Sequence, residues 1–230
     1  MEQYNITICH LYGNLLNTYG DNGNLLLIEY YAKQLGINVQ TEIVSVFEPF
    51  ASDKFDFVFF GGGQDYEQTI CSKDIQHKKE DLITYINQDG PMLAICGGFQ
   101  LLGEYYIGAN GEKIEGIKAL PHYTLSQDNN RFIGDTEIYN EEFDETYYGF
   151  ENHNGMTFLG EGEKPLGIVV KGFGNNGKDK TEGVIFKNVI GSYFHGPLLA
   201  KNKQLALRII NIIMNKKYNK TFTMSDLKNV

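Results

Sequence analysis

The sequence has 230 residues, of which 42% are hydrophobic and 13% aromatic, a proportion that suits one sizeable core. Its formal charge is −9 and its basic residues form no patch, which argues against nucleic acid as the main partner. The three cysteines form no CxxC pair, which argues against a disulfide framework and a zinc site. The sequence contains no secretory leader and no run of about 18 apolar residues, so we expect a cytoplasmic protein without a membrane span.

The first hundred residues alternate between strand-like and helix-like stretches. Apolar, β-branched runs predict strands, and apolar residues that recur on one helical face predict helices. In chain order, the expected strands lie at 5–13, 37–46, 55–63 and 91–96, and the expected helices at 25–36, 77–90 and 98–106. This alternation indicates a parallel sheet that is covered by helices on both faces.

From about Gly116 onward, short strand-like pieces are separated by turn signals. We expect strands within 134–140, 147–159, 166–186 and 188–196, and a terminal amphipathic helix over 198–215. The first three of these stretches look like an antiparallel set beside the parallel sheet. The sequence therefore predicts one α/β domain over residues 1–230, with a mostly parallel sheet flanked by helices and additional antiparallel strands.

The stretch PMLAICGGFQLLG, residues 91–103, places Cys96 at the carboxyl end of a predicted strand. Ligands of open α/β sheets gather beyond that end of the strands. A tight strand-to-helix turn with small neighbours exposes a nucleophile, as in the G-x-S-x-G elbow. The amide of Gly97 would then be placed to donate to an oxyanion. On this turn alone, a buried structural cysteine is an equally good interpretation.

A nucleophilic cysteine needs a base, and the chain has five histidines. His77 fits a surface position and His10 a core or rim position, and His122 has no surrounding pattern that indicates a role. His195 ends the apolar stretch GSYFHG and would emerge at a strand's carboxyl end, as Cys96 does. We therefore prefer His195 as the base, with His153 in GFENHNG as the second candidate.

A second glycine cluster, at 61–63, also follows a predicted strand. Its backbone N–H groups would face the same crevice and complete an oxyanion hole, and the alternative is a flexible turn. A phosphate-binding role is disfavoured, because the chain has neither G-x-x-x-x-G-K-[ST] nor a G-x-G-x-x-G that opens a helix. The sequence thus contains no recognisable ATP site.

Three blocks in this order, GGGQD, AICGGFQLLG and GSYFHGP, resemble class I glutamine amidotransferases of the cobyric-acid-synthase-like branch. Four further blocks, NTYGDNGN, NRFIGD, GFENHNG and GFGNNGKDKTEG, are similar to the glutaminase subunits of lipid II isoglutaminyl synthase. The similarity spans nearly the whole chain. It implies the α/β fold of that class and a role for each matching residue.

Under this resemblance, Cys96 matches the nucleophile and His195 matches the general base. Arg131 matches an arginine that helps to bind the substrate glutamine, and Gln100 is a weaker candidate for a substrate contact. The matching oxyanion-hole elements are Gly62, Gly63 and Gly97.

The chain departs from the broader class after the histidine. Many members continue with Pro and Glu, and the glutamate orients the imidazole, whereas here His195 is followed by Gly196 and Pro197. Either a dyad suffices, or another acid such as Glu151 or Asp21 takes that part. The third member of the site stays open at this point.

The implied reaction is hydrolysis of L-glutamine to glutamate and ammonia through a cysteine thioester. The implied partner is a MurT-like Mur-ligase subunit in a heterodimer. It would hold ATP and Mg²⁺ and use the ammonia to amidate the α-carboxylate of D-glutamate in the lipid-linked stem peptide of lipid II. In this chain itself we expect no metal and no cofactor. Three alternatives remain: an amidotransferase for another acceptor, such as a cobyric-acid-like substrate, a free-standing cysteine hydrolase, and a scaffold that only stabilises a ligase.

Overall fold

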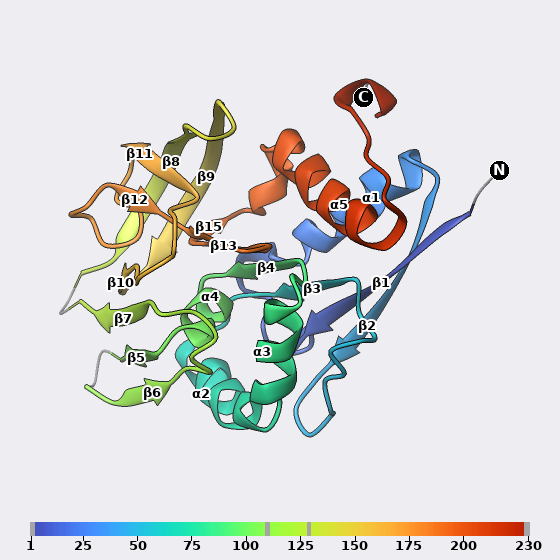
Figure 1. Cartoon of the computed structure of the whole chain (residues 1–230). Coiled ribbons are helices and arrows are strands. Elements are labelled where there is room, and N and C mark those ends of the chain that lie inside the picture. Colours follow the sequence, from blue (N-terminus) through green and yellow to red (C-terminus); the bar gives the residue numbers. More distant parts are fainter. Residues whose placement is uncertain (1–2, 109–110, 128–129, 228–230) are drawn as a thin grey trace.

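The computed structural model describes residues 3–108, 111–127 and 130–227 as three sheets with helices packed around the largest one (Figure 1). That central sheet has six strands in the order β13-β14-β4-β3-β1-β2. They are β1 (Tyr4–Leu11), β2 (Ile37–Val44), β3 (Phe57–Phe60), β4 (Met92–Ile95), β13 (Val184–Phe186) and β14 (Val189–Ser192). All neighbouring strands run parallel except β13 and β14. The predicted α/β class is confirmed.

Helices cover both faces of the central sheet (Figure 1). They are α1 (Gly23–Gln34), α2 (Asp65–Asp74), α3 (Lys79–Asn87), α4 (Gly97–Leu102) and α5 (Lys203–Tyr218). One core cluster joins alternate sheet residues to α1 and α5, and a second joins the other residues to α2, α3 and α4. Because both faces are covered, every residue of β3 and β4 is buried, as their continuous apolar sequence predicts.

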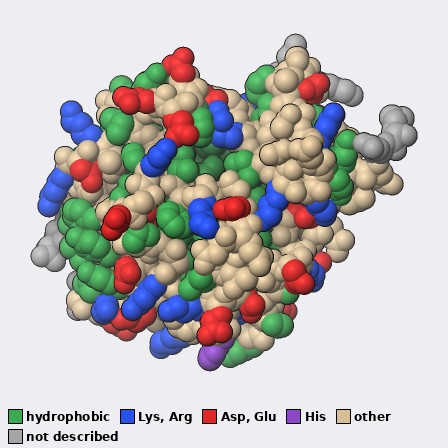
Figure 2. Space-filling model, in the orientation of Figure 1, with side chains coloured by type: hydrophobic (Ala, Val, Ile, Leu, Met, Phe, Trp, Pro, Cys, Tyr) green, Lys and Arg blue, Asp and Glu red, His purple; other side chains and the backbone are tan. Residues whose placement is uncertain are grey.

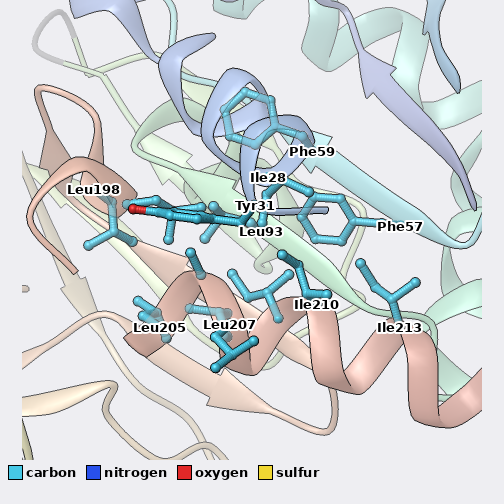
Figure 3. Packing of buried hydrophobic residues seen from close by; sticks show 14 of the residues in the cluster. Ile28, Tyr31, Phe57, Phe59, Leu93, Leu198, Leu205, Leu207, Ile210 and Ile213 are labelled. Atoms are coloured by element: carbon cyan, nitrogen blue, oxygen red, sulfur yellow. The ribbon is translucent and has the colours of Figure 1, made fainter. Parts of the chain in front are cut away.

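The packing of α5 on the sheet follows from its sequence. Its apolar residues recur at helical spacing, and the side chains of Ile210 and Ile213 point toward Phe57 of β3 (Figure 3). The burial of one such side chain contributes about 1.5–3 kcal/mol to folding. This hydrophobic layer between α5 and the central sheet stabilises the sheet, and the candidate site lies at the ends of its strands.

Two smaller sheets lie at one side of the central sheet (Figure 1). The four-stranded sheet, in the order β10-β7-β5-β6, contains β5 (Tyr105–Ile107), β6 (Lys113–Glu115), β7 (Tyr123–Ser126) and β10 (Gly155–Phe158). The five-stranded antiparallel sheet, in the order β12-β11-β8-β9-β15, contains β8 (Phe132–Asn140), β9 (Glu145–His153), β11 (Gly167–Lys171), β12 (Thr181–Glu182) and β15 (Phe194–His195). The antiparallel set that the second half of the sequence predicts is thus present.

Three local expectations are corrected. The helix expected over 98–106 ends at Leu102, because Gly103 adopts an extended backbone with φ −76° and ψ −167° and the chain turns there into β5. Helix α2 was not expected at all. The stretch 188–196 is two strands in different sheets, since the backbone N–H of Tyr193 donates to the Glu182 carboxyl group at 2.7 Å and not to a neighbouring strand.

The molecular surface in Figure 2 has acidic and basic side chains interspersed over the visible face. They form no continuous basic field on the part of that face that is described. In residues 3–108, 111–127 and 130–227, no helix is long and apolar enough to cross a membrane.

Candidate active site

Cys96 lies at the sharp turn between β4 and α4. Its backbone has φ 50° and ψ −105°, a region that non-glycine residues rarely adopt, and such strain costs on the order of 1–3 kcal/mol. Its N–H donates to the Ser192 carbonyl at 2.9 Å, which fixes the turn against β14. Gly98 is required behind it, because a Cβ there would lie 2.4 Å from the Phe60 carbonyl oxygen. The predicted elbow is therefore present, with the thiol half-buried in a cavity.

His195 lies in the same cavity, on β15. Its Nδ1 lies 3.1 Å from Oδ1 of Asp21, and its Nε2 is buried without a hydrogen-bond partner in the described structure. Burial alone would lower the pKa of His195, but the Asp21 carboxylate and the nearby Cys96 side chain raise it above the ordinary value. The imidazole is thus disposed to carry a proton beside the sulfur atom.

Of the two acids that the sequence leaves open, Asp21 is the one that contacts His195. Asp21 is fully buried, and its second oxygen, Oδ2, accepts a hydrogen bond from the Gly62 amide at 3.1 Å. The Glu151 carboxylate instead accepts the backbone N–H groups of Phe173 and Gly174, at 2.7 and 2.9 Å. Cys96 and His195 therefore share the cavity, and Asp21 contacts the far side of the His195 ring.

The glycine loop at residues 61–63 lies directly beside Cys96. A Cβ on Gly62 would lie 3.0 Å from the Cys96 Cβ, yet the Gly62 amide is engaged by Asp21 and is not directed at an oxyanion. The expectation of Gly62 as a donor is corrected on this point. A Cβ on Gly97 would lie 3.4 Å from the Gly63 nitrogen, so the backbones of these two residues adjoin beside the cysteine. Gly97 and Gly63 remain the oxyanion-hole candidates.

The cavity has a volume of about 420 Å³ and collects most of the predicted site residues. Its lining includes Cys96, His195, Gly63, Gln100, Arg131 and the second candidate base, His153. Residues that sequence analysis singled out on α4, β9, β15 and two loops thus meet in one place. Within the described residues, no group of three His, Cys, Asp or Glu side chains could hold a metal ion.

Arg131 is exposed at the cavity and is held by one neighbour. Its Nε and Nη2 donate to Oδ1 of Asn152 at 3.1 and 2.9 Å, and Nη2 also donates to the Asn152 carbonyl at 3.1 Å. Asn152 in turn donates through Nδ2 to the Tyr19 hydroxyl at 2.8 Å. The guanidinium is therefore fixed in place with other N–H groups left to bind a carboxylate.

Gln100 lines the cavity, but its side chain is occupied by the protein. Its Oε1 accepts from Gln68 Nε2 at 2.7 Å, and its Nε2 donates to the Tyr193 hydroxyl at 3.1 Å. These bonds join α4 to α2 and to the segment before His195. Its position thus fits a support of the cavity wall better than a direct contact with substrate.

Among the lining residues that sequence reasoning did not single out are Tyr19, Gln68 and Asn152. Tyr19 and Asn152 lie in the blocks NTYGDNGN and GFENHNG, and proximity to Asp21 and His153 was the one available signal. Gln68 lies on α2, which was itself not predicted. A cysteine at a strained turn, an imidazole with a buried acid and adjoining amides are together the components of acyl transfer by a covalent intermediate.

Comparison with known proteins agrees with this geometry. Residues 7–203 match the CobB/CobQ-like glutamine amidotransferase domain. The chain is 58% identical over 215 residues to the GatD subunit of the glutamine-hydrolysing lipid II isoglutaminyl synthase of Streptococcus pneumoniae, covering 94% of this chain and 83% of that protein. The corresponding Staphylococcus aureus subunit is 40% identical over 202 residues, covering 88% and 82%.

A crystal structure of a glutamine amidotransferase shares the fold, with a TM-score of 0.58 at 17% identity over 89% of this chain and 98% of that chain. The fold, the domain match and the two relatives agree with one another. The chain belongs to the CobB/CobQ-like glutamine amidotransferases and, within them, to the GatD family.

Proposed function

We propose that this chain hydrolyses L-glutamine and supplies the ammonia to a MurT-like Mur-ligase subunit, which amidates the α-carboxylate of D-glutamate in the lipid II stem peptide. The observation that carries the proposal is that Cys96, at its strained turn, and His195, held from behind the lining by buried Asp21, share one cavity. The two relatives are named as glutamine-hydrolysing subunits of lipid II isoglutaminyl synthase, which supports this acceptor and a partner subunit.

In the first half-reaction, the Cys96 thiolate attacks the side-chain amide carbon of glutamine and a C–S bond forms. The amides of Gly63 and Gly97 stabilise the negative charge that develops on the amide oxygen. The imidazolium of His195 gives its Nε2 proton to the departing nitrogen, the C–N bond breaks, and ammonia leaves. Asp21 holds the imidazole through Nδ1 and stabilises its charged form.

In the second half-reaction, the neutral imidazole of His195 takes a proton from water, and the resulting hydroxide attacks the glutamyl thioester. The C–S bond breaks, glutamate leaves, and the thiolate and imidazolium are restored. Arg131 binds the α-carboxylate of the substrate at the outer part of the cavity.

The partner subunit, in this proposal, binds ATP and Mg²⁺ and activates the acceptor carboxylate, and this chain contributes neither. We place the reaction in the cytoplasm, because the three free thiols of the chain suit a reducing compartment. The two chains would form a heterodimer, so that ammonia reaches the activated carboxylate before it becomes diluted.

The test uses the complex of this chain with its Mur-ligase-like partner, ATP and lipid II, and compares L-glutamine with ammonium chloride as nitrogen source. Cys96→Ala is expected to lower glutamine-dependent amidation by at least about 10³-fold and to leave ammonium-dependent amidation intact. The control is Cys71→Ala, which removes a buried thiol outside the cavity and should support both reactions. Undiminished glutamine-dependent amidation by Cys96→Ala would contradict the nucleophile assignment.

A covalent probe tests the same cysteine without turnover. A glutamine-like electrophile such as 6-diazo-5-oxo-L-norleucine should add one equivalent of label to Cys96, detected by mass spectrometry of the intact chain and its peptides. The absence of labelling at every pH would favour the alternative of a catalytically silent scaffold.

A further inference from the structure

His153 is a buried histidine of the cavity to which the reaction above gives no task. It ends β9, is 2% exposed and lines the cavity with Cys96. Its Nδ1 lies 2.8 Å from the Gly155 carbonyl oxygen. Since a carbonyl only accepts hydrogen bonds, Nδ1 carries the proton. Nε2 is buried and has no partner in the described structure, although a buried polar atom is normally satisfied.

The surroundings of His153 fix its ring and its protonation state. The ring is stacked on Tyr193 at 3.7 Å between centroids and 6° between planes, so it cannot turn away from the cavity without losing this contact. Burial lowers the pKa of His153 despite the Glu151 carboxylate, whose Oε2 lies 3.9 Å from Nε2. Nε2 therefore presents a lone pair, which accepts hydrogen bonds and donates none.

The negative charge of Glu151 lies close to this lone pair. Burial alone would raise the pKa of Glu151, but the nearby His153 ring and the backbone N–H groups of Phe173 and Gly174, which donate to its two oxygens, lower it, so Glu151 is a carboxylate at neutral pH. At 3.9 Å its oxygen is too far from Nε2 for a hydrogen bond but close enough to attract a cation placed beside the ring. This part of the cavity thus suits a cationic hydrogen-bond donor.

The neighbouring part of the same wall has the opposite charge. Phe132 pairs with His153 across β8 and β9, and Arg131, the residue before Phe132, is bound to Asn152, the residue before His153. Arg131 and His153 both line the cavity, so a guanidinium and an acceptor close to a carboxylate face the same space. A free amino acid carries its carboxylate and its ammonium on a single carbon atom, so its two charges match these two neighbours.

We propose that Nε2 of His153 accepts a hydrogen bond from the α-ammonium group of glutamine, with Glu151 supplying the compensating charge, while Arg131 binds the α-carboxylate. This inference rests on the proposed glutaminase function and deepens it. His153 is then a substrate-binding residue and not a second base. The wall selects a free L-amino acid over a peptide-bound glutamine or a simple amide, which lack one or both charges.

The experiment measures binding by calorimetry to the full chain in its partner complex, with Cys96→Ala to prevent turnover. The two ligands are L-glutamine and 4-carbamoylbutanoate, which is glutamine without its α-amino group. With His153 intact, loss of the amino group is expected to weaken binding about 10-fold to 100-fold, the range of a charged hydrogen bond. In His153→Phe, which keeps the stacked ring, glutamine should bind as weakly as 4-carbamoylbutanoate, and the ratio should fall to about 1.

Two further variants separate this role from a structural one. Arg131→Ala should weaken both ligands and keep the amino-group ratio at about 10-fold or more, because it removes the other contact. His153→Asn offers an amide oxygen as a replacement acceptor and should restore part of the ratio.

Equal binding of the two ligands with His153 intact would overturn the inference, and this measurement needs no variant at His153. So would a full amino-group ratio in a folded His153→Phe chain. If glutamine itself failed to bind, the proposed glutaminase function would fall together with the inference.

Discussion

The two ends of the cavity each hold a buried histidine near a buried carboxylate, and the two imidazoles differ in the charge they favour. At the nucleophile end, Nδ1 of His195 lies 3.1 Å from Asp21 and the pKa of His195 is raised. At the other end, Nδ1 of His153 faces a backbone carbonyl, Glu151 lies 3.9 Å from Nε2, and burial lowers the pKa of His153. One ring is suited to carry a proton and the other to present a lone pair.

The difference arises from what the carboxylates already bind. One N–H group, from Gly62, donates to Asp21 and leaves its other oxygen to the imidazole. Each oxygen of Glu151 accepts one backbone N–H group, and these two hydrogen bonds already stabilise the negative charge of the carboxylate without His153. A carboxylate near a histidine is thus insufficient to make it a base, because direct contact with a free oxygen is also required.

Removal of the charge at the nucleophile end should have the largest effect. Asp21→Asn is expected to lower kcat for glutamine hydrolysis by about 10²-fold to 10⁴-fold, since the imidazolium of His195 loses its stabilising partner. The carboxylate raises the pKa of His195, so its loss lowers that pKa. The alkaline limb of the kcat/KM profile should therefore move to lower pH, which steady-state rates across the pH range would measure.

The matched control is Asp135→Asn, which makes the same change of charge on an exposed residue of β8. It should leave both kcat and the alkaline limb in place. A profile of Asp21→Asn that superimposes on the unmodified one, apart from its height, would mean that Asp21 does not set the protonation of His195.

A second prediction concerns the segment that joins the two ends. Glu182 is fully buried and accepts from Tyr193 N–H at 2.7 Å and from the Ser192 hydroxyl at 3.1 Å. Burial raises the pKa of Glu182 from 4.5 to about 8. Between these values Glu182 loses its proton in the unfolded chain and keeps it in the folded chain, so its contribution to the free energy of unfolding should fall as pH rises from about 4.5 to 8.

The Glu182→Gln side chain does not ionise, so this decline should disappear in the variant. Between pH 5 and pH 8, the unmodified chain should lose on the order of a few kcal/mol more unfolding free energy than the variant loses. Denaturant unfolding at the two pH values measures the difference. Glu161→Gln, on an exposed residue, should leave the pH dependence unchanged. If Glu182→Gln shifted stability equally at both pH values, Glu182 would be ionised in the fold.

The sequence indicated that Cys96 and His195 would share one crevice, because each follows a largely apolar stretch that ends at the same edge of the fold, and both line one cavity. It named Asp21 and Glu151 as possible acids but could not choose between them, since Asp21 is separated from His195 by 174 positions and lies in a polar loop with no periodic pattern. It also missed the break at Tyr193, because the stretch from Val189 through Phe194 is apolar apart from Gly191 and Ser192 and predicts one strand. At that break the Tyr193 N–H donates to the Glu182 carboxyl group, and this contact forms only in the folded chain.

The glycine loop shows the same limit. Spacing after a strand indicated that backbone N–H groups would face the cysteine, and the loop does adjoin it. Which amide remains directed at substrate depends on the Asp21 side chain, which engages Gly62. Local sequence thus predicts elements and their ends, whereas the division of hydrogen bonds among them is a property of the tertiary structure.

The smallest effect is expected at Tyr19, the residue that touches both ends of the cavity. Its ring contacts the His195 ring edge-on at 4.8 Å, and its hydroxyl accepts from Asn152, which holds Arg131. Tyr19→Phe keeps the ring and removes a half-exposed hydrogen bond of about 0.5–1.5 kcal/mol, so KM for glutamine should rise about 2-fold to 10-fold with kcat nearly unchanged. Tyr19→Leu removes the ring as well and should also lower kcat. A fall in kcat for Tyr19→Phe without a change in KM would instead tie the hydroxyl to His195, and the two ends of the cavity would then be coupled through Tyr19.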